Sequence, residues 1–166
     1  MKRRLAILTL TTLAVAAFIG VVSAAAQSPA LAGGATQISG VGVFDEADTC
    51  DSASVGADFA LIMSGDLDGC LYTFVETSES SPSGTYRETG TELFVASDGA
   101  GSFETTYRFE AKYEDVDTLS GEIFGRCQHP IVEGSGTGIY EGVSGRFDIK
   151  DDVEAGCFLY RGHLRY

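Results

Sequence analysis

The residues of this chain that could do chemistry are mainly its carboxylates, since 24 of its 166 residues are Asp or Glu. Two carboxyl groups can act as acid and base when burial raises the pKa of one of them. No spacing selects such a pair, but Glu76 and Glu88 lie near aromatic residues in segments that have a strand pattern. We predict that these two are candidate buried acids; the alternative is that both point outward into solvent.

The histidines and cysteines show no spacing typical of a metal centre or of a nucleophilic site. No C-x-x-C pair occurs, and His129 and His163 are far apart, so the sequence predicts no metal site. No G-x-S-x-G motif supplies a serine nucleophile for either histidine. The sequence therefore names no catalytic residue.

A glycine-rich stretch, "GSGTGIYEGVSGRF" at 134–147, raises the question of a phosphate-binding loop. A dinucleotide-binding loop needs G-x-G-x-x-G before a helix, and a P-loop needs a lysine. The last glycine spacing is wrong for the first, the stretch has no lysine for the second, and strand-like alternation follows Gly138. We instead predict positive-φ turns and close-packed corners. The glycines concerned are Gly134, Gly136, Gly138, Gly142 and Gly145.

The first 26 residues have the pattern of a secretory signal peptide. Basic residues at positions 2–4 precede an apolar run and the small-residue sequence "SAAAQS". The alternative is an uncleaved membrane anchor, because the apolar run is long enough to span a bilayer. We predict cleavage near Ala26 and a secreted, extracellular protein with no membrane span in its mature chain. The predicted organisation is a signal peptide at 1–26, a flexible leader at 27–36 and a single domain at 37–166.

The mature chain is strongly acidic. Without the three basic residues of the signal, 8 basic residues face 24 acidic ones, a formal charge of −16. Such a surface repels nucleic acid and anionic membranes, so we predict no nucleic-acid partner. The charge either keeps a secreted protein in solution or steers a basic partner. A homo-oligomer is allowed by the sequence and has no support in it.

The four cysteines favour two disulfides, because the chain is exported and their number is even. Proximity in sequence favours Cys50 with Cys70 and Cys127 with Cys157. The other two ways of pairing the four remain open, since strand geometry decides which sulfurs meet.

Alternation of apolar and polar residues predicts strands along most of the mature chain. The clearest segment is "SFETTYRFEAKYE" at 102–114, where a period of two indicates a long half-buried strand. Turn residues separate such segments, and no convincing helix occurs. Eight short-linked strands require a sandwich or a barrel. We predict an all-β fold, a closed eight-stranded antiparallel β-barrel that is calycin-like in shape. The other strands are expected at 37–44, 58–64, 70–79, 85–97, 119–133, 145–152 and 157–166.

Seven aromatic side chains should share the inner face of these strands. They form either an ordinary packed core or the lining of a lipophilic pocket, in which tyrosine hydroxyls would supply the few polar contacts. The predicted pocket-lining residues are Phe103, Tyr107, Phe109, Tyr113, Phe147, Phe158 and Tyr160.

The sequence "GTGIYEGVSGRFDI", followed by "CFLYRGHL", resembles the C-terminal signature of the allene oxide cyclase barrel family, which is similar in fold to the dirigent proteins. The segment "SFETTYRFEAKYEDVDTLSGE" is similar to that family's central strand pair. The resemblance covers 102–164 and implies an eight-stranded antiparallel barrel that holds a lipophilic substrate without a metal or organic cofactor. Plant members use a glutamate and an asparagine, and because this chain has no asparagine, no catalytic residue is carried over.

Three functions fit these observations. The first is a secreted protein that binds a small apolar molecule in its barrel. The second is a cofactor-independent cyclase or isomerase acting on a lipophilic substrate, the activity that the resemblance implies. The third is an extracellular structural or interaction domain, for which an exposed apolar patch or an oligomer interface is expected. Whether the chain is an enzyme is left open.

Overall fold

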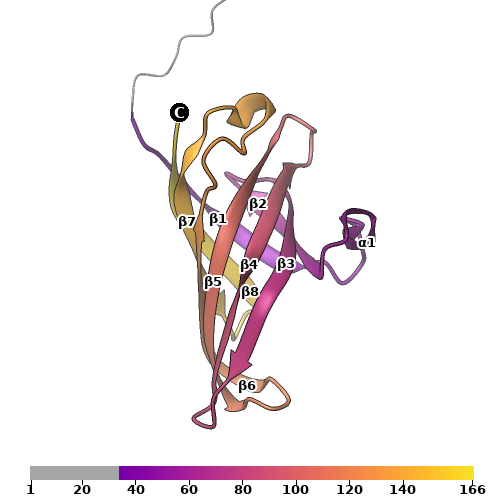
Figure 1. The fold of residues 1–166 in the computed structure, drawn as a ribbon, viewed down its shortest axis with the longest axis vertical. Helices are drawn as coiled ribbons and strands as arrows, with labels where there is room; N and C mark the ends of the chain where they lie inside the picture. Colours follow the sequence, from indigo (N-terminus) through magenta and orange to yellow (C-terminus); the bar gives the residue numbers. More distant parts are fainter. Residues whose placement is uncertain (1–33) are drawn as a thin grey trace, which may run out of the picture.

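Eight antiparallel strands close into a barrel in the computed structural model, which describes residues 34–166 (Figure 1). Each strand pairs with the next, and β8 closes the barrel by pairing with β1. The predicted fold class is therefore confirmed. The strands are β1 Thr36–Phe44, β2 Phe59–Gly65, β3 Gly69–Ser80, β4 Thr85–Ala96, β5 Ser102–Asp115, β6 Ser120–Pro130, β7 Ser144–Asp152 and β8 Cys157–Arg165.

The predicted signal peptide at 1–26 and the leader as far as residue 33 lie outside the described residues. Strand β1 begins at Thr36, one residue before the predicted start of the domain. Within the described part of the chain, no helix has the length and hydrophobicity needed to cross a membrane.

Alternation along each strand decides which side chains enter the barrel. In β5, Phe103 and Thr105 are fully buried, whereas Glu104 between them is exposed. The two faces predicted for 102–114 are therefore confirmed, because successive side chains of a strand point to opposite sides of the sheet.

Two short helical turns lie in connections between strands, where no helix was predicted. Helix α1, Ser52–Val55, lies in the long β1–β2 loop, and the 3-10 turn η1, Gly138–Tyr140, lies in the β6–β7 connection. The strand-like alternation expected directly after Gly138 was thus wrong, since β7 starts only at Ser144. Four glycines of this connection have positive φ, as predicted: Gly134, Gly138, Gly142 and Gly145. Gly136 is a close-packed corner, where a Cβ would collide with the Tyr140 carbonyl.

The β6–β7 connection plugs one end of the barrel, where the C-terminus also lies (Figure 1). Tyr140 packs edge-on against Phe94 and Phe103, with ring centroids 5.8 and 5.1 Å away. Deeper in the same end, the Tyr160 hydroxyl accepts a hydrogen bond from the buried backbone N–H of Leu67 at 2.7 Å. The side chains at this end, among them Phe94, Phe103 and Tyr140, belong to the packed hydrophobic core.

The first predicted disulfide is confirmed: Cys50 is bonded to Cys70 and ties the β1–β2 loop to the barrel wall. The second, Cys127–Cys157, was wrong, because both thiols are free in the described chain. Cys127 on β6 pairs with Ile149 of β7, and β7 separates it from Cys157 on β8. Strands two apart are about 9–10 Å from each other, beyond the reach of a disulfide.

Candidate functional site

The end of the barrel opposite the plug is hollow. A cavity of about 230 Å³ lies among the inward side chains near the β1–β2, β3–β4, β5–β6 and β7–β8 connections. Four of the predicted pocket residues line it: Tyr107, Phe109, Tyr113 and Phe158. The other three, Phe103, Phe147 and Tyr160, belong to the packed core, so their placement in a pocket was wrong. Strand alternation gives the face of a residue but not its height along the barrel.

The floor of the cavity is a buried polar network around Glu92 and His129, which are 4% and 2% exposed. The Glu92 carboxylate accepts hydrogen bonds from Thr105 at 2.7 Å and Thr73 at 3.4 Å, and it contacts His129 Nδ1 at 2.6 Å. The His129 ring stacks on Phe147 with a centroid distance of 4.6 Å and an interplanar angle of 2°. The carboxylate orients the ring and requires the Nδ1 proton, while Nε2 has no hydrogen-bond partner among the described residues.

One wall carries Glu88, the predicted acid that the structure does place in the cavity. Its carboxylate accepts hydrogen bonds from the hydroxyls of Tyr86 at 2.5 Å and Tyr107 at 2.7 Å. Burial, with this carboxylate as a second cause, raises the pKa of Tyr86 to about 12 and the pKa of Tyr107 still further. The other predicted acid, Glu76, is exposed at an irregularity in β3, so its burial was wrong.

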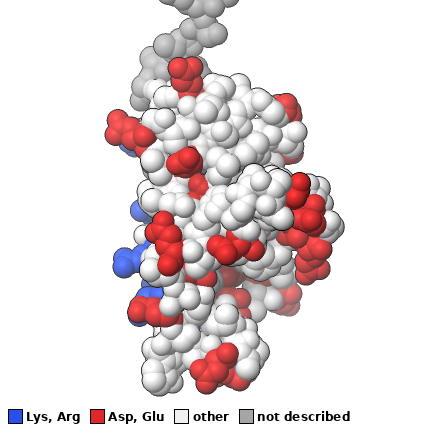
Figure 2. Space-filling model, turned by 45° about the vertical axis from the view of Figure 1, so that its right-hand side comes forward, with Lys and Arg blue, Asp and Glu red and all other residues white. Residues whose placement is uncertain are grey.

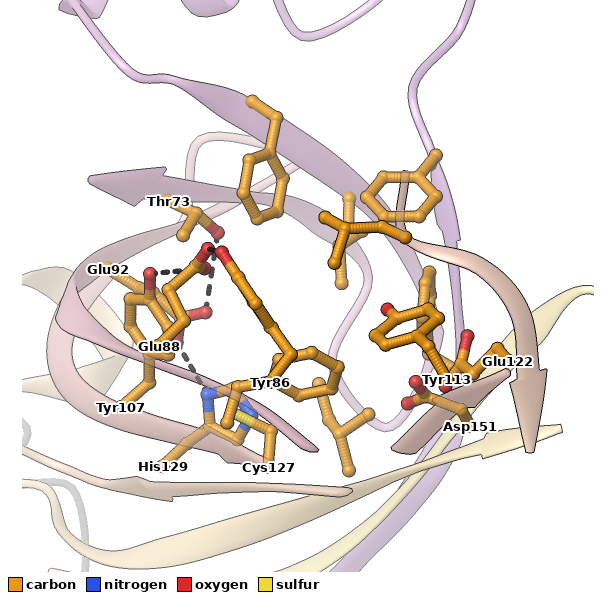
Figure 3. A pocket seen from close by; sticks show the side chains of 17 residues that line it. Thr73, Tyr86, Glu88, Glu92, Tyr107, Tyr113, Glu122, Cys127, His129 and Asp151 are labelled. Carbon is orange, nitrogen blue, oxygen red and sulfur yellow. Dashed lines mark hydrogen bonds and ion pairs between the residues drawn. The ribbon is translucent and has the colours of Figure 1, made fainter. Parts of the chain in front are cut away.

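The facing wall carries a second acidic pair, Glu122 on β6 and Asp151 on β7 (Figure 3). Asp151 is only 8% exposed. Burial, reinforced by the neighbouring Glu122 carboxyl, raises the pKa of Asp151 to about 8. Among the described residues, Glu122 Oε1 and Asp151 Oδ1 are buried without any hydrogen-bond partner. We call Glu122 and Asp151 the carboxyl pair.

A β-bulge brings Glu122 into the barrel. Tyr113 of β5 pairs with Glu122 while its neighbour Lys112 pairs with Phe124, so Ile123 is the extra residue. Without the bulge, alternation would turn Ile123 inward and Glu122 outward. Instead Ile123 is 56% exposed. The bulge thus exchanges an apolar side chain for a carboxylate inside the cavity.

Gly125 leaves the space that the carboxyl pair occupies. A Cβ at this position would overlap the Asp151 carboxylate and lie 2.5 Å from Glu122 Oε1. Asp151 itself follows Phe147 and Ile149 on the inward face of β7. The two carboxyls therefore meet because an inward face, a bulge and a missing side chain coincide.

Sequence reasoning missed several lining residues that alternation could have found. Glu92 is four residues from the candidate Glu88 in β4 and therefore lies on the same face of that strand. Asp151 is likewise four residues from Phe147 in β7. His129 was considered only for a metal site or a nucleophilic site and set aside, although it lies two positions from the inward Cys127. Alternation could not have found Glu122, because the bulge turns this side chain from the outer face of β6 to the inner face.

The charged side chains that line the cavity are acidic. Four carboxyl groups line it, and none of the described lining residues is Lys or Arg. The surface seen in Figure 2 has the same bias, with Asp and Glu spread over the face and the few Lys and Arg side chains near one edge. Within residues 34–166, no group of three or more His, Cys, Asp or Glu is arranged to hold a metal ion.

No protein-family model, curated protein or solved structure matches this chain. The resemblance to the allene oxide cyclase barrel family therefore stays a prediction, and any function has to be argued from the cavity itself.

Proposed function

We propose that this protein binds a small lipophilic molecule in the hollow end of its barrel. The observation that carries the proposal is the cavity itself, which has aromatic walls and lies beyond the core residues Phe94, Phe103 and Tyr140 of the opposite end. Specific small-molecule sites are concave, mostly apolar and equipped with a few fixed polar groups. The predicted export of the chain fits a role outside the cell.

The cavity volume limits the size of the ligand. Pockets for drug-sized ligands measure about 300–1,000 Å³, so the cavity of about 230 Å³ is smaller than these. A compact organic molecule of roughly ten non-hydrogen atoms fits such a space. Long-chain lipids would extend well beyond it.

Calorimetric titration with 2-phenylethanol and 2-phenylethylamine, which share one ring and one chain length, tests the proposal. We expect binding of one molecule per chain, weakened at least tenfold in Leu61→Phe, which fills the cavity from a lining position. Leu159→Phe, on the outer face of β8 at 42% exposure, is the matched control and should bind like the wild type. Binding of neither probe to the wild type would overturn the proposal.

A second candidate function is a cofactor-independent isomerase or cyclase, and the floor of the cavity favours it. Because Glu92 holds the Nδ1 side of His129, Nε2 is the ring nitrogen without a partner among the described residues, and in a neutral ring it is the proton acceptor. A base fixed beside a bound substrate can remove a proton from carbon next to a carbonyl group.

Deuterium exchange into phenylacetone, followed by NMR in D₂O, tests this second function. The wild type should accelerate exchange at the benzylic carbon, and His129→Gln should reduce the rate by about 100-fold, the lower end of the usual contribution of general acid–base catalysis. Exchange at the buffer rate with the wild type would exclude the function for such ketones and leave ligand binding unaffected.

A further inference from the structure

We propose that the ligand of this cavity is a lipophilic amine whose ammonium group is bound by the carboxyl pair, Glu122 and Asp151. This inference rests on the proposed ligand-binding function and specifies the chemical class of the ligand.

Hydrogen-bond donors within the protein satisfy the other carboxylates of the cavity. Glu92 receives donors from two threonines and His129, and Glu88 receives two tyrosine hydroxyls. Among the four carboxyl groups that line the cavity, those of the pair alone keep a buried oxygen, Glu122 Oε1 and Asp151 Oδ1, without a donor among the described residues. A buried carboxyl oxygen that accepts no hydrogen bond is costly, so this is where a ligand's donors have most to gain.

Two local features of the backbone place the carboxyl pair inside the barrel at a cost in stability. The bulge at Ile123 turns Glu122 inward although the unbulged strand would bury isoleucine, and Gly125 clears the volume that the two carboxyls fill. Bulges beside functional sites commonly re-aim a side chain in this way. A barrel that needed only a packed interior would be more stable with the isoleucine inside.

An ammonium group suits two neighbouring carboxyls better than other donors do. It has three N–H groups and can donate to more than one oxygen, whereas an alcohol has a single donor. The rings of Tyr86 and Tyr113, with centroids 6.4 Å apart, also line the cavity, and the face of an aromatic ring attracts a cation. A carboxylate ligand would meet four acidic side chains and no lysine or arginine among the lining residues.

Binding of the ammonium should release a proton from the pair. Asp151 has a pKa raised to about 8, so the pair holds a shared proton below that pH, and the cation displaces it. The other titratable groups that line the cavity include Tyr113 from β5, Tyr86 and Glu88 from β4 and Cys127 from β6. Burial raises the pKa of both tyrosines to about 12 and the pKa of the Cys127 thiol far above its usual range, so none of these three loses a proton near pH 7.

The test is calorimetric titration of the full mature chain with three probes of the same skeleton: 2-phenylethylamine, 2-phenylethanol and phenylacetate. We expect the amine to bind at least tenfold more tightly than the alcohol at pH 7.5 and phenylacetate not to bind. The preference for amine should shrink towards one in Asp151→Asn and Glu122→Gln. It should persist in Glu154→Gln, an exposed acid of the β7–β8 turn. Titrations in phosphate and in Tris should show proton release on amine binding below pH 8, with affinity rising up to tenfold per pH unit.

The outcomes separate this inference from the proposed function. Equal binding of the amine and the alcohol would overturn the inference and leave the lipophile site intact. Failure of both probes would overturn the site itself. Displacement of the amine by 1 mM Ca²⁺ in the wild type but not in Asp151→Asn would show a cation-binding pair for metal and would also overturn the inference.

Discussion

The substitution Asp151→Asn should stabilise the protein, and increasingly so as the pH rises. In the folded chain the pKa of Asp151 is raised from 3.8 to about 8, chiefly by burial and then by the Glu122 carboxyl. The folded state therefore binds this proton more tightly than the unfolded state. Wild-type stability must fall between about pH 4 and about pH 8, the window in which only the folded state keeps the proton.

The expected size follows from the same values. Each pH unit within this window removes up to about 1.4 kcal/mol, so the three units from pH 5 to pH 8 remove about 4 kcal/mol at most. Asparagine does not titrate and keeps the shape of the side chain. We expect the stability of Asp151→Asn relative to the wild type to increase by about 2–4 kcal/mol between pH 5 and pH 9, because the half-buried Glu122 keeps some contact with water.

Urea denaturation followed by far-UV circular dichroism at pH 5, 7 and 9 measures this difference. Glu154→Gln removes the same charge from the neighbouring β7–β8 turn, where the side chain is exposed, and its effect should stay within about 0.5 kcal/mol at every pH. A difference between Asp151→Asn and the wild type that does not change with pH would refute the reasoning.

Three further changes test the fold and the site. Replacing both Cys50 and Cys70 by alanine opens a link between residues 20 apart and should lower the free energy of unfolding by about 3 kcal/mol; an unchanged urea midpoint would contradict this. Tyr160→Phe leaves the buried N–H of Leu67 without its acceptor and should cost about 1–3 kcal/mol, measured in the same way, whereas a loss under 0.3 kcal/mol would show that the N–H finds another partner. Gly125→Ala should push the carboxyl pair apart and reduce the amine-to-alcohol affinity ratio at least threefold in calorimetry; an unchanged ratio would argue against the geometry proposed for the pair.

The strands were predictable because their cause is local. Alternation from 102 to 114 placed Phe103 and Thr105 inside and Glu104 outside, as the structure does. Turn residues separated the predicted strands, and Gly84 and Gly99, which lie in the β3–β4 and β4–β5 connections, both have positive φ. Eight segments of this kind, joined by short connections, leave few arrangements besides a closed antiparallel barrel.

The pairing of the cysteines was predictable only in part. Cys50 and Cys70 are joined by a loop and an adjacent strand, so nearness in sequence became nearness in space. The same argument failed for Cys127 and Cys157, because β7 lies between their strands. Sequence distance does not show which strand separates two residues in a barrel.

What the sequence determined by itself was the strand pattern, the inward face of most strands, the positive-φ turns and the acidic character of the surface, since each depends on residues close together in the chain. Only the tertiary structure decided where those inward residues lie along the barrel axis. It buried Phe147 and Tyr160 in the plugged end and left Phe109 and Phe158 around a cavity. It also joined Glu122 to its acidic partner on β7, because a one-residue bulge reverses a face and closure of the barrel sets which side chains meet across it.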